Sequence, residues 1–246
     1  GQATHAEQMR AEFESARRDR PNNGGTMMWM LNDCWPTANW SIIDYYRRPK
    51  PSYYAARRAC SPLAPIIMER GGKVEFFLSN DGPKSCNASI VYGHERIDGT
   101  EVWKKETKIR ISKVDTVKFD SAVRSSMQFR EGDYLYIDAK IAGVRLPRVT
   151  YFPLMWKNVQ WPEPHIRLKL LEQKQEDAGW ITRVAVSTDK YARFCHLVIP
   201  ESAGFAWPDD NFFDLCAGGR HIVSVSSQRS FEPGEIRTGH WLTDWP

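Results

Sequence analysis

Aromatic and polar side chains are concentrated in one stretch near the start of the chain, WMLNDCWPTANWSIIDYY at residues 29–46. Aromatic residues at this density form either a protein core or the stacking surface of a ligand site. Polar groups set between the rings favour the ligand site. The candidate residues are Trp29, Trp35 and Trp40 as ring faces, with Asn32, Asp33 and Asp44 as the polar groups between them.

The elements around this stretch are predicted to be helix, buried strand, long loop and helix. Thr4 and Glu7 have capping-box spacing, and Ala6, Met9, Phe13 and Ala16 follow on one helical face. The apolar run at 25–31 is typical of a strand buried on both faces of a parallel sheet. Proline suits the first turn of a second helix at 51–59. Such a strand needs neighbours on both edges, so residues 1–60 are either a small α+β appendage or the tail of a larger α/β domain.

From residue 61 the pattern changes to short alternating runs separated by turns, which predicts antiparallel sandwiches. The first set of strands is predicted at 74–78, 88–92, 108–111, 116–119, 134–141 and 149–152. The prolines at 162 and 164 make an extended break. The second set is predicted at 166–171, 180–187, 194–199 and 221–226.

Composition excludes several classes of protein. The chain has 246 residues, 41% hydrophobic and 26% charged, as expected of a globular protein. The balance of 34 basic to 30 acidic residues does not favour a nucleic-acid partner. No apolar run is long enough to span a membrane, and residues 1–18 do not have the architecture of a signal peptide.

The five cysteines are widely spaced and form no CxxC pair, which predicts neither a disulfide scaffold nor a zinc site. We expect them to be buried or half-buried thiols, and their odd number favours an intracellular location slightly. No metal or organic cofactor is predicted.

The chain resembles the C-terminal portion of glycoside hydrolase family 2 enzymes of the β-mannosidase type. The pattern W-x-L-N-D-x-W-P, then S-W-S-x-x-D-Y-Y and x-R-x-K-x-x-Y-Y, is matched by Trp29, Leu31, Asn32, Asp33, Trp35, Pro36, Trp40, Ser41, Asp44, Tyr45, Tyr46, Arg48, Lys50, Tyr53 and Tyr54. The stretches 78–82 and 210–215, the latter with the turn at 218–219, are similar to segments of the two C-terminal sandwiches of that family. Asn39 replaces a common serine or threonine, and Arg47 replaces a usual glycine.

The resemblance implies three domains. Residues 1–60 would be the C-terminal end of a (β/α)8 catalytic barrel with strand eight, and 61–155 and 156–246 would be immunoglobulin-like β-sandwiches. Such retaining enzymes use two carboxyl groups, which the family carries in Asn-Glu and Ser-Glu contexts absent from this sequence. Glu7, Glu12 and Glu14 are expected on the solvent face of the first helix. We therefore expect no catalytic residue in this chain, with both carboxylates upstream of Gly1.

The same resemblance makes Trp29 a platform under the sugar, with a non-proline cis peptide after it that would be lost or relaxed without the rest of the barrel; the alternative is a core tryptophan. For Trp35 and Trp40 two alternatives stay open: contact with the sugar at the rim of the site, and burial under a sandwich. Asn32 and Asp33 are expected to hold the loop through side-chain to backbone hydrogen bonds, and Asp44 to pair with Arg48. The four tyrosines at 45, 46, 53 and 54 are expected to pack.

Three functions are therefore kept in view. The first is part of a retaining exo-acting β-mannosidase that binds carbohydrate; exo-β-glucosaminidases carry a similar W-P-x-x-x-W-x-x-x-D-Y-Y stretch and are an alternative. The second is a non-catalytic carbohydrate-binding module with Trp103, Trp156, Trp180 or Trp207 as platforms. The third is a structural role. Residues 1–60, with unpaired strand edges, are expected to self-associate or to pack irregularly.

Overall fold

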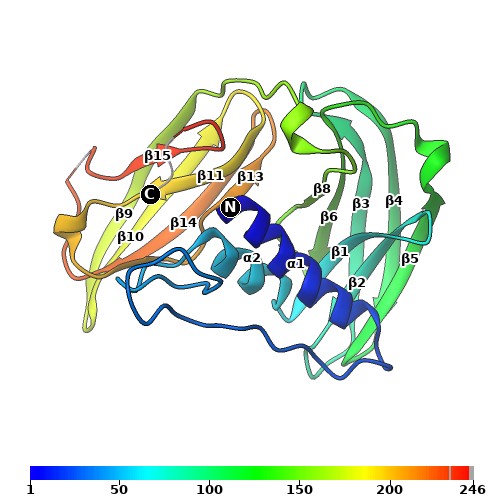
Figure 1. The fold of residues 1–246 in the computed structure, drawn as a ribbon, viewed down its shortest axis with the longest axis horizontal. Helices are drawn as coiled ribbons and strands as arrows, with labels where there is room; N and C mark the ends of the chain where they lie inside the picture. The colour runs from blue at the N-terminus through cyan, green and yellow to red at the C-terminus, as the bar shows by residue number, and fades with distance from the viewer. Residues whose placement is uncertain (233, 244–246) are drawn as a thin grey trace. The chain divides into compact units, whose positions relative to one another are not determined.

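The computed structural model describes residues 1–232 and 234–243. It is mainly β, with antiparallel sheets (Figure 1). The chain divides into two compact units, one formed by residues 1–96 and 100–160 and the other by 97–99 and 161–246. In the described part of the chain, no helix is long and apolar enough to cross a membrane.

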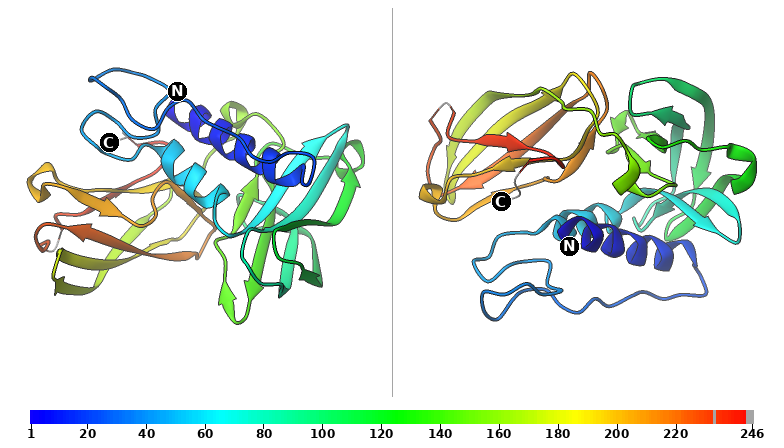
Figure 2. Two further views of the ribbon diagram at one scale, coloured as in Figure 1. Left: turned by 90° about the horizontal axis from the view of Figure 1, so that it is seen from below. Right: turned by 45° about the horizontal axis from the view of Figure 1, so that its top comes forward.

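Two helices, α1 (Gln2–Arg18) and α2 (Pro51–Ala59), lie side by side in the first unit (Figures 1 and 2). Ala6, Met9 and Ala16 are buried on the predicted face of α1, and proline opens α2 as predicted. The capping box is wrong, because α1 begins at Gln2 without a side-chain cap and Thr4 already lies within the helix.

Glu14 also departs from the prediction that the glutamates of α1 face solvent. Its side chain belongs to the buried part of the helix, with only 4% of the residue exposed. Burial disfavours the charged form and raises the pKa of Glu14 to about 7. An amphipathic pattern places Glu14 among polar positions, but the packing of the surrounding elements decides which of those positions water reaches.

The predicted buried strand at 25–31 is wrong. These residues have irregular backbone, and the surrounding segment 19–50 forms a long loop beside the two helices (Figure 2). Only isolated bridges occur there, from Asn32 to Ile43 and from Ile43 to Pro49. An apolar run becomes a buried strand only when strands on both sides accept its backbone hydrogen bonds, and no described strand does so here.

The first unit also holds a sandwich of two sheets. One has the order β1-β2-β5, and the other has the order β4-β3-β6-β7 with β8 paired to β6. The bounds are β1 (Leu63–Arg70), β2 (Lys73–Asn80), β3 (Cys86–Arg96), β4 (Glu101–Ile111), β5 (Asp115–Val123), β6 (Asp133–Ile141), β7 (Val144–Arg145) and β8 (Val149–Tyr151). Phe76 and Leu78 from the first sheet share a core with Ile90 and Ile137 from the second. Every predicted run in this region falls on a strand, whereas β1 and β7 were not predicted.

The second unit is built from β9 (Ile166–Glu176), β10 (Gly179–Thr188), β11 (Ala192–Val198), β12 (Ala206–Pro208), β13 (Phe213–Leu215), β14 (Arg220–Ser227) and β15 (Arg237–Gly239). Its sheets have the orders β12-β14-β10-β9 and β13-β11-β15. Val184 and Val223 pack against Leu197 and Phe213 between the two sheets. The four runs predicted here lie on β9, β10, β11 and β14, and the short strands β12, β13 and β15 were not predicted.

All five cysteines are free thiols, but their burial differs from the prediction. Cys34 and Cys60 are exposed, while Cys195 is fully buried in the core of the second unit. Burial raises the pKa of Cys195 to about 12, so this thiol stays protonated and serves as a small apolar side chain.

Candidate functional site

The candidate site is the segment 27–50, here called the aromatic loop. Trp29, Trp35 and Trp40 are 82%, 68% and 66% exposed. Tyr45 and Tyr46 are exposed as well, so the expectation that they pack is wrong, whereas Tyr54 is buried as expected. Neither burial of Trp29 in a core nor burial of Trp35 and Trp40 under a sandwich occurs in this structure.

A buried ionic contact closes the aromatic loop. The ammonium group of Lys50 donates hydrogen bonds to Asp33 Oδ2 at 2.8 Å, to Ser41 Oγ at 2.7 Å and to the carbonyl of Asn39 at 3.4 Å. The Asp33 side chain is almost completely buried. Burial alone would raise the pKa of Asp33, but its hydrogen bonds to Lys50 and Ser41 and the charge of Lys50 outweigh burial and lower it. Asp33 therefore stays ionised and binds side chains, not the backbone atoms we expected.

Backbone hydrogen bonds close the base of the loop on itself, and one apolar side chain fixes it to the helices. The amide of Ile43 donates to the carbonyl of Leu31 at 2.9 Å, and the amide of Lys50 donates to the carbonyl of Ile42 at 2.9 Å. Ile42 is buried and packs in a cluster with Met9 of α1 and Ala56 of α2. The loop thus keeps a defined position although it contains no regular strand.

Asp44 and Arg48 form the predicted pair at the turn that follows. Arg48 Nε lies 3.0 Å from Asp44 Oδ2, and the Arg48 amide donates to Asp44 Oδ1 at 2.8 Å. Between them Arg47 has a φ of 64°, a conformation that glycine adopts without steric cost. This explains why glycine suits this position in the family that the sequence resembles. The Arg48 guanidinium also lies 4.9 Å from the Tyr46 ring.

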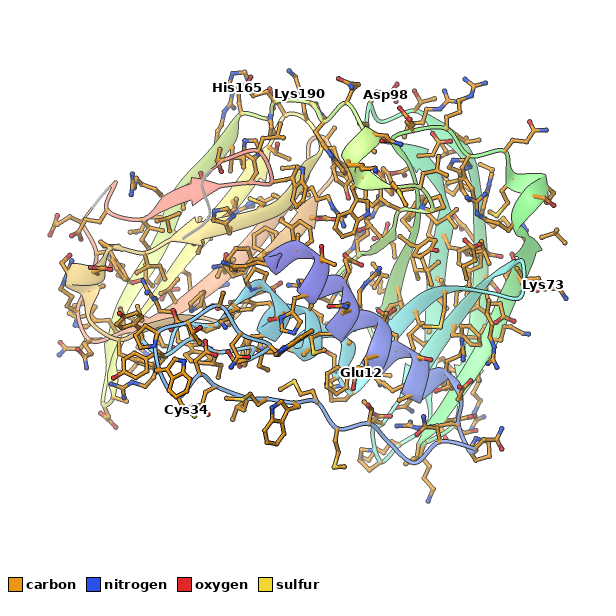
Figure 3. The ribbon with its side chains drawn as sticks, viewed as in Figure 1. Glu12, Cys34, Lys73, Asp98, His165 and Lys190 are labelled. Atoms are coloured by element: carbon orange, nitrogen blue, oxygen red, sulfur yellow. The ribbon has the colours of Figure 1, made fainter. Side chains whose placement is uncertain are left out.

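Three further features lie at the N-terminal end of the loop or just before it. Thr26 Oγ1 donates to Glu12 Oε1 of α1 at 2.6 Å, which ties the segment before Trp29 to the helix. Figure 3 shows Glu12 on α1 and Cys34 on the aromatic loop. The Trp29–Met30 peptide is cis, as the resemblance implied, so the expectation that it would be lost or relaxed in this chain is wrong. Asn32 donates to the carbonyl of Asp33 at 3.2 Å, a loop contact of the expected kind.

The loop offers apolar ring faces and pairs its two carboxylates internally. Asp33 is bound to Lys50 and Asp44 to Arg48, so both carboxylates are engaged in ion pairs within the loop. Aromatic faces with polar neighbours suit the apolar faces of sugar rings, which carry C–H groups between their hydroxyls. Among the described residues, no cluster of histidine, cysteine and carboxylate groups could hold a metal ion. The exposed ring faces are therefore suited to binding a ligand.

The four tryptophans considered as platforms of a binding module do not form an exposed set. Trp103, Trp156, Trp180 and Trp207 are each only partly exposed. Trp103 packs against the core of the first sandwich, with ring centroids 6.4 Å from Phe76 and 6.0 Å from Tyr92. Their partial burial favours packing over sugar stacking.

Curated proteins named Beta-mannosidase B are similar to the chain in sequence. The protein of Aspergillus terreus is 24% identical over 256 residues, which cover 94% of this chain and 29% of that protein. The protein of Emericella nidulans is 30% identical over 195 residues, covering 75% of this chain and 22% of that protein. The protein of Aspergillus niger is 47% identical to this chain over 66 residues. The chain thus spans less than a third of the length of these relatives, and no family model matches it.

Solved structures share the fold over nearly the whole chain. A β-D-mannosidase from Dictyoglomus thermophilum superimposes with a TM-score of 0.82 at 21% identity, covering 98% of this chain and 29% of that one. An exo-chitosanase from Amycolatopsis orientalis superimposes with a TM-score of 0.75 at 16% identity, again over 98% of this chain and over 33% of its own. At these identities the likeness shows the fold.

Proposed function

We propose that this chain, which in sequence and fold is the C-terminal portion of a glycoside hydrolase family 2 enzyme of the β-mannosidase type, supplies aromatic contacts to the sugar site of a retaining exo-acting β-mannosidase. Such an enzyme removes terminal β-linked mannose from oligosaccharides or glycans. The observation that carries the proposal is the exposure of Trp29, Trp35 and Trp40 on a loop held by the buried Lys50–Asp33 contact. The names of the curated relatives support mannose as the sugar.

In this proposal residues 1–60 complete a (β/α)8 barrel, and the ranges 61–155 and 156–246 are immunoglobulin-like sandwiches. The apolar run at 25–31 supports the barrel, because its exposed Met27, Trp29 and Leu31 have the composition of a buried strand and not of a surface loop. Active sites of such barrels lie at the C-terminal ends of the strands, where Trp29 would stand. Segment 25–31 forms no backbone hydrogen bonds with a described strand. Neighbouring barrel strands would supply these hydrogen-bond partners.

The chemistry of the proposed enzyme needs two carboxyl groups about 5 to 5.5 Å apart, one as nucleophile and one as acid and then base. Neither is on the aromatic loop in this proposal, because Asp33 and Asp44 are engaged in ion pairs. Trp29 would lie under the sugar in the cleavage subsite. Positive charge develops on the sugar ring in the transition state. The negative face of an indole ring therefore stabilises the transition state more than the neutral ground state.

The test is hydrolysis of aryl β-mannoside and aryl β-glucosaminide by this chain and by the full-length protein that contains it. We expect the folded chain alone to hydrolyse neither, and the full-length protein to prefer the mannoside. Turnover by the chain alone that disappears in Asp33→Asn or Asp44→Asn would overturn the assignment of these residues as structural. A full-length protein that prefers the glucosaminide would instead support the exo-β-glucosaminidase alternative.

A further inference from the structure

A row of positive charges crosses the outer face of the β4-β3-β6-β7 sheet in the first unit. Side chains alternate between the two faces of a strand, and Ala88 and Ile90 of β3 point into the core, so Ser89 between them points outward. Ser89 lies opposite Lys108 of β4 on one side and Lys140 of β6 on the other. Lys140 in turn lies opposite Arg145 of β7. We call Lys108, Lys140 and Arg145, with Ser89 between the lysines, the basic row.

The positive charges of the basic row are not paired with carboxylates of the described residues. Lys108, Lys140 and Arg145 are exposed and form no ion pair with any described residue. Other cations of this sandwich do find carboxylates, as Lys105 does with Asp120 and Arg148 with Asp138. Like charges directly opposite each other on paired strands destabilise a sheet, so Lys140 and Arg145 repel. An anion bound over the row would remove this repulsion.

The surroundings of the row add hydrogen-bonding groups to the charge. Asn87 precedes it on β3, is exposed and lies opposite Arg110, which also forms no ion pair with the described residues. On the other side, Val91 lies opposite Glu106 and Asp138, so the positive field is confined to one end of the sheet. The hydroxyl of Ser89 and the amide of Asn87 can donate to and accept from neutral hydroxyl groups between the cations.

We propose that the basic row is a binding site for an acidic oligosaccharide that carries sulfate or phosphate esters. Neighbouring strands lie about 4.8 Å apart, so the backbones of Lys108 and Lys140 are separated by roughly 10 Å and Arg145 follows roughly 5 Å further on. This linear spacing fits a chain with repeated anionic groups better than one small anion. Single-stranded nucleic acid fits less well, because its bases stack on aromatic rings and the described residues of this sheet expose none.

The test measures binding of fluorescent dextran sulfate to the chain, with neutral dextran as the matched probe. We expect the sulfated probe to bind at low salt and to be released at about 0.5 M NaCl, because exposed charges are screened there. Neutral dextran should not bind. The triple variant Lys108→Gln, Lys140→Gln, Arg145→Gln should bind dextran sulfate at least about tenfold more weakly, since three charge contacts are removed.

The control variant Arg167→Gln, Lys169→Gln, Lys190→Gln removes the same charge from exposed residues of the second unit that also lack an ion pair with the described residues. It should bind dextran sulfate like the unchanged chain, and circular dichroism should show both triple variants folded. Equal loss in both triples would overturn the proposal, because only net charge would then matter. Equally tight binding of single-stranded DNA to the row, or of inorganic phosphate at the same concentration as dextran sulfate, would overturn the assignment to an acidic oligosaccharide. None of these readouts depends on glycosidase activity.

Discussion

The ammonium group of Lys50 lies 2.8 Å from the carboxylate of Asp33, and this contact joins the two ends of the segment that carries Trp35 and Trp40. Both groups are largely buried, and Lys50 also binds Ser41. Removing one partner leaves the other charge buried without compensation.

Lys50→Met should therefore lower the free energy of unfolding by about 1 to 3 kcal/mol, which urea denaturation can measure. Lys174→Met is the matched control, because Lys174 and Glu176 are both exposed and 3.8 Å apart; it should change stability by less than about 0.5 kcal/mol. Equal effects of the two substitutions would contradict the anchoring role of Lys50.

Glu14 predicts a dependence of stability on pH. Its pKa is raised to about 7 in the folded chain, from 4.5, so the folded state holds a proton that the unfolded state releases between these values. Stability from this group is present below pH 4.5 and is lost as pH rises toward 7. Glu14→Gln should thus raise the free energy of unfolding at pH 8 by on the order of 2 kcal/mol and leave it unchanged at pH 4.

The control for Glu14 is Glu131→Gln, because Glu131 is exposed. Denaturation curves of this variant should follow the unchanged chain at both pH values. A Glu14→Gln variant that is less stable than the unchanged chain at pH 8 would show that the Glu14 carboxylate has a stabilising partner.

Arg17 joins α1 to the first sandwich. Its guanidinium is buried and donates to the carbonyl of Ser61 at 2.8 Å and to Ser79 Oγ at 3.1 Å, and it lies 3.3 Å from Asp81. Arg17→Ala should lower the free energy of unfolding by about 3 kcal/mol, because several buried acceptors lose their donor at once. Denaturation of Arg167→Ala, an exposed arginine, provides the comparison, and a similar small loss in both variants would contradict the role given to Arg17.

Exposure of the aromatic loop predicts self-association of the chain through residues 1–60. Sedimentation velocity at increasing concentration should show dimers or larger species, since large exposed apolar surfaces favour association. The triple variant Trp29→Ser, Trp35→Ser, Trp40→Ser should shift the chain toward monomer, whereas Phe205→Ser, an exposed aromatic of the second unit, should not. A monomer at all concentrations in the unchanged chain would contradict this prediction.

Local sequence patterns predicted much of this fold, and they also predicted the ion pair between residues that are close in sequence. Alternating apolar residues predicted the strands that carry the cores, and the spacing of Asp44 and Arg48 predicted their ion pair. Strand β1 was missed because Pro65 interrupts its run, and proline removes a backbone donor.

Features that depend on residues far apart in the sequence could not be predicted from local patterns. The run at 25–31 has the composition of a buried strand, but composition does not state whether strands lie beside it. Lys50 was not identified as the partner of Asp33, because the two are seventeen positions apart and loop geometry brings them together. The basic row depends on the register of four strands, which the sequence does not specify.

The most direct test of the proposed sugar site is the kcat/KM of full-length Trp29→Ala toward aryl β-mannoside, with Trp207→Ala as the control. In full-length Trp29→Ala that circular dichroism shows to be folded, kcat/KM should fall about tenfold to hundredfold through loss of the ring face under the sugar. Trp207→Ala should leave kcat/KM unchanged in protein that remains folded. Full activity of Trp29→Ala, in protein that hydrolyses the mannoside, would contradict the account.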